Sequence, residues 1–116
     1  MKEAENVDLN VQHETKLLSL LKKKRSFFEA ILDLTEEESS LSISDWISTL
    51  EQKKVLLSCI DEIDAEISPF KAAFHQLSQD VVEELDKIKD IVKDILHLDS
   101  SNFEKRKKQF DEDLRT

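Results

Sequence analysis

The chain contains no glycine among its 116 residues, and this absence limits its possible folds more than any other feature. Average glycine usage of about 7% would give roughly eight glycines in a chain of this length. Phosphate-binding loops, dinucleotide-binding turns, glycine hairpin turns and glycine helix stops all depend on this residue. The sequence therefore excludes a Rossmann fold, a P-loop fold and a β-sandwich.

The composition favours long amphipathic helices. Charged residues make up 37% of the chain and apolar residues 39%, a mixture typical of helical proteins rich in Leu, Glu and Lys. The length suits one domain, so we expect a single helical domain over residues 1–116. The net charge of −9 argues against general nucleic-acid binding, because that activity needs an excess of basic residues.

Cysteine usage and hydropathy predict a cytoplasmic protein. Cys59 is the only cysteine, which excludes an internal disulfide and suits a reducing compartment. No run reaches the ~18 apolar residues of a membrane span. The first residues, Met1–Asn6, lack the apolar core of a signal peptide. We therefore expect neither a membrane span nor a secretion signal.

A first helix is expected over about residues 10–38, because apolar residues recur there at intervals of three and four. The serine-rich segment 39–44 then favours a turn, since serine side chains compete for backbone hydrogen bonds. Ser42 precedes Asp45 by three residues, a weak form of the capping box, and Ser44 is the alternative cap. The turn is short, so the next helix should run antiparallel to the first.

A second helix is expected over about residues 43–77. Trp46, near its start, is interpreted as an anchor of the hairpin close to Phe28 or Ile31. Pro69 predicts either a kink or a brief break, because proline removes one helical hydrogen bond but is favoured at the first position of a new helix.

A third helix is expected over about residues 79–112, where apolar residues between Val81 and Ile95 follow a heptad seam. The polar segment 99–102 either leaves this helix intact or breaks it. The three helices predict an all-α fold, an antiparallel helical hairpin with a third long helix in a coiled-coil-like bundle. The apolar stripes are narrow, which leaves apolar surface for a partner.

Candidate catalytic and metal sites are weak in this sequence. Asp94 and His97 share a helix face, but the Glu-x-x-His pairs of a di-iron bundle are missing, so a solvated surface is the better interpretation. Cys59 lies within a helix, away from the helix N-terminus that activates a thiol, and is interpreted as a packed small residue. We therefore expect no enzymatic activity, no metal and no cofactor.

Short runs of like charge are interpreted structurally. The acidic runs 36–38 and 111–113 are expected to solvate the ends of helices. The basic runs 22–25 and 105–108 are expected to form charge pairs between helices.

Three apolar residues interrupt the most polar stretch of the chain, namely Phe103, Phe110 and Leu114. Two interpretations remain open for them. They either pack back onto the bundle, or they form an exposed apolar surface that a partner covers.

Two segments resemble the FlgN-type flagellar export chaperones. Residues 27–64, FFEAILDLTEEESSLSISDWISTLEQKKVLLSCIDEID, contain a helix with an acidic end, a short loop and a second helix patterned around Leu50, Lys53 and Ile60. Residues 88–110, IKDIVKDILHLDSSNFEKRKKQF, contain an Ile-rich seam that leads into a Lys-rich end. The resemblance extends over about residues 14–114.

The resemblance implies a small cytoplasmic chaperone of type III export, without ATPase activity. Such a protein keeps a terminal amphipathic helix of a hook–filament junction protein soluble and delivers it to the export apparatus. The client-binding residues carried over from the family are Ile91, Ile95, Leu98, Phe103, Phe110 and Leu114. The alternative is a structural coiled-coil adaptor subunit of a larger assembly, such as another type III secretion component. Either protein would act as a monomer or a homodimer.

Overall fold

The computed structural model describes residues 2–70 and 78–115, with side chains from Gln12 onward. The elements are α1 (Lys2–Glu37), the short 3₁₀ helix η1 (Glu38–Ser40), α2 (Ile43–Ile67) and α3 (Gln79–Arg115). These described ranges contain no strand. The prediction of an all-α bundle of long helices is therefore confirmed.

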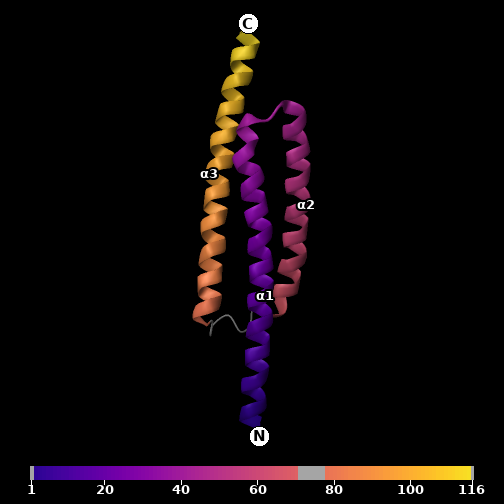
Figure 1. Ribbon diagram of the computed structural model, residues 1–116, viewed down its shortest axis with the longest axis vertical. Coiled ribbons are helices and arrows are strands. Elements are labelled where there is room, and N and C mark those ends of the chain that lie inside the picture. Colours follow the sequence, from indigo (N-terminus) through magenta and orange to yellow (C-terminus); the bar gives the residue numbers. More distant parts are fainter. Residues whose placement is uncertain (1, 71–77, 116) are drawn as a thin grey trace.

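The helices run up, down and up along a rod. In Figure 1, α1 lies between the other two, with α2 antiparallel to it and α3 parallel to it. The rod measures 78 × 21 × 18 Å. Helix α1 makes the most extensive contacts, first with α3 and then with α2, so α1 is the helix that holds the bundle together.

The core follows heptad seams that face α1. One cluster of buried residues joins Leu17 and Leu21 of α1 to Ile63 of α2 and Val81 of α3. A second cluster, nearer the α1–α2 turn, takes one buried isoleucine from each helix: Ile31, Ile60 and Ile95. Truncating a buried isoleucine of this kind to alanine costs about 2–5 kcal/mol, so both clusters are substantial sources of stability.

The start of α1 differs from the expectation. The helix begins at Lys2 rather than near residue 10. Residues 2–5 are Lys, Glu, Ala and Glu, which are among the best helix formers. Acidic residues in a first turn are also stabilised by the helix dipole. The apolar periodicity that marked the expected boundary reports which residues are buried, and a helix can extend beyond them.

The end of α2 is earlier than expected. The α-helix stops at Ile67, its C-cap Ser68 donates its backbone N–H to the Asp64 carbonyl, and a 3₁₀ turn covers 68–70. Pro69 has no N–H with which to continue the helical hydrogen bonds. The expected continuation over residues 71–77 lies outside the described residues.

Helix α3 is continuous through residues 99–102 and ends at Arg115, so the break considered for this segment is absent. Two polar side chains of this segment bond to other elements instead of competing for their own backbone. Asp99 accepts a hydrogen bond from Lys53 of α2, and Asn102 donates one to the Thr35 carbonyl of α1.

Side-chain caps start both later helices. Ser42 is the N-cap of α2, where its hydroxyl oxygen accepts a hydrogen bond from the Asp45 N–H at 3.2 Å; the Ser42 prediction is confirmed. Ser78 accepts a similar bond from the Val81 N–H at 3.3 Å at the start of α3. These caps satisfy backbone donors that the first helical turn leaves unpaired.

The basic run 22–25 forms charge pairs between helices, as predicted. Lys24 of α1 bonds to Asp64 of α2 at 2.6 Å. Arg25 bonds to Glu84 of α3, whose side chain is buried, and to Glu29 one turn along its own helix. The hydrogen bond to Glu84 raises the pKa of Arg25.

Candidate partner-binding groove

A buried polar cluster joins the three helices at the α1–α2 turn. Glu38 and Lys53 are only 3% and 8% exposed, and their side chains form an ion pair at 2.7 Å. Lys53 also bonds to Asp99 of α3 at 3.0 Å. Asn102 donates hydrogen bonds to the Thr35 carbonyl and to Glu38. Among the described residues, every buried side-chain nitrogen or oxygen has a hydrogen-bond partner.

Arg106 attaches α3 to the turn itself. Its Nη2 donates to the carbonyl oxygens of Glu38 at 2.8 Å and Leu41 at 2.6 Å. Its guanidinium also lies 5.2 Å from the ring centroid of Trp46, within the range of a cation–π contact. Arg106 therefore fixes the beginning of α2 relative to the last third of α3.

Two sequence interpretations are corrected at this cluster. Glu38 does not solvate a helix end, because Lys53 neutralises it inside the bundle. Trp46 lies against Arg106 and belongs to neither cluster of core residues that contains Phe28 or Ile31. The heptad spacing could have indicated that Glu38 is buried, since Glu38 continues the series of buried positions that runs through Ile31 and Thr35.

Beside this cluster, an open groove of about 1260 Å³ separates the first half of α2 from the last part of α3. Its walls carry apolar side chains from both helices and the turn. On the α2 side these are Leu41, Ile43, Trp46, Leu50 and Leu57, and on the α3 side they are Phe103 and Phe110. We call this feature the α2–α3 groove.

The groove exists because the apolar face of α2 is wider than the part of it that packs in the core. The core side of this face carries Lys53, Ile60 and Ile67, which are buried. Leu50 and Leu57 lie three residues before Lys53 and Ile60, on the adjoining edge of the same face, and remain 40% and 49% exposed. This edge of α2 is therefore left open.

The six residues carried over from the chaperone family separate into two groups. Ile95 is 7% exposed and belongs to the core, and Ile91 packs against the same cluster. Their assignment to an open binding surface is therefore wrong. Leu98 is partly buried and does not line the groove.

The aromatic members of that set remain available to a partner. Phe103 and Phe110 are 66% and 63% exposed and line the groove together. Leu114 is 70% exposed and lies beyond the residues that line the groove. Of the two interpretations of this stretch, the structure therefore favours an exposed apolar surface.

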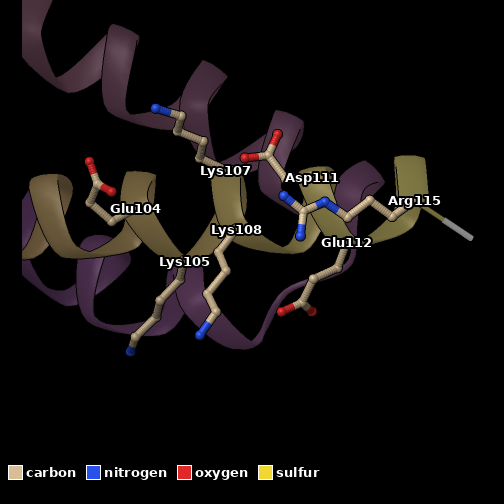
Figure 2. A pocket seen from close by; sticks show the side chains of 7 residues that line it. All are labelled: Glu104, Lys105, Lys107, Lys108, Asp111, Glu112 and Arg115. Carbon is tan, nitrogen blue, oxygen red and sulfur yellow. The ribbon is translucent and has the colours of Figure 1, made fainter.

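After Arg106, α3 extends past the α1–α2 turn, and we call residues 107–115 the α3 extension. All of these residues are exposed, and Figure 1 shows no neighbouring helix at the level of the C-terminal tip. Figure 2 shows charged side chains projecting from this part of α3 in several directions. The described part of the chain therefore leaves most of the surface of Phe110 and Leu114, the apolar residues of the extension, uncovered.

Other candidate chemistry finds no support in the described ranges. They contain no group of three or more His, Cys, Asp or Glu side chains placed to hold a metal ion. Asp94 and His97 are exposed on α3, and Cys59 is partly buried as a free thiol. Within the same ranges, none of the helices has the length and apolar character needed to span a membrane.

Comparisons with protein-family models, with curated proteins and with solved structures find no match to this chain.

Proposed function

We propose that the chain is a cytoplasmic chaperone of flagellar, type III protein export. In this proposal it binds a terminal amphipathic helix of a hook–filament junction protein, keeps that helix soluble and delivers it to the export apparatus. The observation that carries the proposal is the α2–α3 groove, which has apolar side chains on both walls. The resemblance of residues 27–64 and 88–110 to FlgN-type chaperones supports the choice of client.

The groove has the dimensions of a site for one helix. From Ile43 to Leu57, its α2 wall extends over roughly 20 Å at 1.5 Å per residue, about four helical turns. An amphipathic helix placed there would complete a four-helix arrangement in this half of the rod. Lys54, Lys107 and Asp113 also line the groove, so charged groups of both signs lie beside its apolar walls.

The test is a calorimetric titration of the purified chain with the terminal segment of a hook–filament junction protein. We expect 1:1 binding. Replacing both Leu50 and Leu57 by aspartate should weaken it at least ~30-fold, the effect of losing about 2 kcal/mol at a binding hot spot. These substitutions spare the buried polar cluster, so the variant should keep its helical circular dichroism.

The matched control is Val55→Asp. Val55 lies on the same helix and is 63% exposed, but it does not line the groove. The control should bind the client as the unmodified chain does. Equal binding by all three proteins would refute the groove as the client site, and no binding of junction-protein segments by the unmodified chain would refute the proposed function.

A structural adaptor subunit is the second candidate, and the α3 extension favours it because an uncovered helix end is a natural docking element. The two functions differ in where the chain is found. A permanent adaptor co-purifies with the mature flagellar or secretion assembly, whereas an export chaperone stays in the cytoplasm. Quantifying the chain in both fractions distinguishes them.

A further inference from the structure

The α3 extension carries a charge pattern that complements itself. A basic run, 105–108, is followed after Gln109 and Phe110 by an acidic run, 111–113. The lysines at 105, 107 and 108 and the acids at 111 and 112 are all exposed, and Figure 2 shows their side chains extending from α3.

An apolar stripe accompanies these charges. Phe103, Phe110 and Leu114 are spaced by seven and four residues, which places them on one face of the helix. They are 66%, 63% and 70% exposed. These three side chains form a continuous apolar stripe with little cover, and such a stripe favours a partner helix.

We propose that this partner is a second copy of the chain, with the two α3 extensions paired antiparallel through Phe103, Phe110 and Leu114. A parallel pairing would set basic run against basic run and acidic against acidic. An antiparallel pairing centred on residue 109 brings the basic run of each copy level with the acidic run of the other. Lys107 and Asp111 flank the apolar stripe at helical spacing, and this pairing sets Lys107 of each copy level with Asp111 of the other.

The expected dimer is weak and reversible. The overlap spans residues 103–115, about 20 Å of helix, and a single helix–helix contact of that length falls below the ~1,200 Å² of a standard stable interface. Phe103 and Phe110 also line the α2–α3 groove. If the proposed function holds, a client helix and a second copy therefore compete for the same aromatic side chains.

Sedimentation velocity over a range of protein concentrations tests the pairing. The sedimentation coefficient of the unmodified chain should rise from the monomer toward the dimer as concentration increases. Phe110→Asp should abolish that rise, while Val55→Asp, at a position with the same 63% exposure, should retain it. A monomeric unmodified chain up to roughly 1 mM, where even contacts of −4.1 kcal/mol are half-populated, would overturn the proposal.

Charge reversal tests whether the basic run of one copy pairs with the acidic run of the other. One variant carries Lys105→Glu, Lys107→Glu and Lys108→Glu, and the other carries Asp111→Lys and Glu112→Lys. Each variant alone should remain monomeric, because its own runs now have one sign, and an equimolar mixture should form a heterodimer. A mixture that stays monomeric, or single variants that dimerise as the unmodified chain does, would contradict the charge-paired interface.

Solution X-ray scattering tests the orientation. Antiparallel extensions place the two bundles end to end with an overlap of about 20 Å, so the longest dimension of the dimer should be about 135 Å, against 78 Å for the monomer. A dimer no longer than the monomer would overturn the arrangement. These experiments contain no client, so they test the dimer independently of the proposed function. If the chain is monomeric but binds a junction-protein segment, only the dimer proposal is refuted. If the chain dimerises but binds no such segment, only the proposed chaperone function is refuted.

Discussion

At the scale of single residues, the most informative feature is that charged side chains occupy heptad positions. Lys53 lies on the same buried series of α2 as Ile60 and Ile67, and Glu38 continues the buried series of α1. Because such a pair loses hydration on burial, it adds little net stability, but removing one partner leaves an uncompensated charge. A polar group in an apolar seam also specifies how the helices align.

Lys53→Ala should lower the free energy of unfolding by about 3 kcal/mol, because Glu38 is then buried without its cation. Urea denaturation followed by circular dichroism measures this change. The matched control is Lys54→Ala, an exposed neighbour, which should change stability by less than about 0.5 kcal/mol. Equal losses for both variants would show that the Glu38–Lys53 pair does not matter to the fold.

The sequence could not reveal this ion pair as a pair. The spacing is consistent with seam positions for Glu38 and Lys53, but charged residues are almost never buried unless they are paired. Only the packing of α3 across the turn, with Asp99 and Asn102 supplying further partners, makes burial of both side chains favourable.

At the scale of helices, local signals decided the starts of α2 and α3 and the end of α2 before Pro69, whereas tertiary contacts kept α3 continuous. Ser42 and Ser78 cap the helices that they precede, and Ser42 was predicted as a cap from its spacing to Asp45. The continuity of α3 through residues 99–102 could not be predicted from local signals. Asp99 and Asn102 can compete for backbone hydrogen bonds, but in the structure they bond to Lys53 of α2 and to the Thr35 carbonyl of α1.

Ser42→Ala should destabilise the chain by about 1 kcal/mol, the usual cost of losing an N-cap. Ser44→Ala is the matched control, because Ser44 is an exposed residue within the first turn of α2 and is not the cap. Thermal denaturation of both variants measures the difference. If Ser44→Ala were the more damaging change, α2 would start two residues later than described.

At the scale of the whole molecule, the fold class followed from the absence of glycine and from apolar periodicity, whereas the candidate site followed only in part. The exposed tail residues Phe103, Phe110 and Leu114 were recognised. The α2 wall of the groove was missed, because the packing of α2 against α1 leaves one edge of its apolar face uncovered. The packing of α3 in the bundle places Ile95 in the core, with Ile91 against it.

The elongated shape gives a prediction of its own. The radius of gyration is 19.5 Å, whereas a compact chain of this length would have about 13 Å. Solution scattering at high dilution, where any dimer has dissociated, should return a value near that of the rod. A value near that of a compact globule would mean that the three helices fold back into a shorter bundle.

The contact between Arg106 and Trp46 gives the chain an intrinsic optical probe. Trp46 is the only tryptophan, it lines the groove, and its indole lies 5.2 Å from a guanidinium carbon. An occupant of the groove would exclude water from this ring, so the emission maximum would move toward the blue without any added label. Ligand screening on the unmodified chain can therefore begin with a fluorimeter.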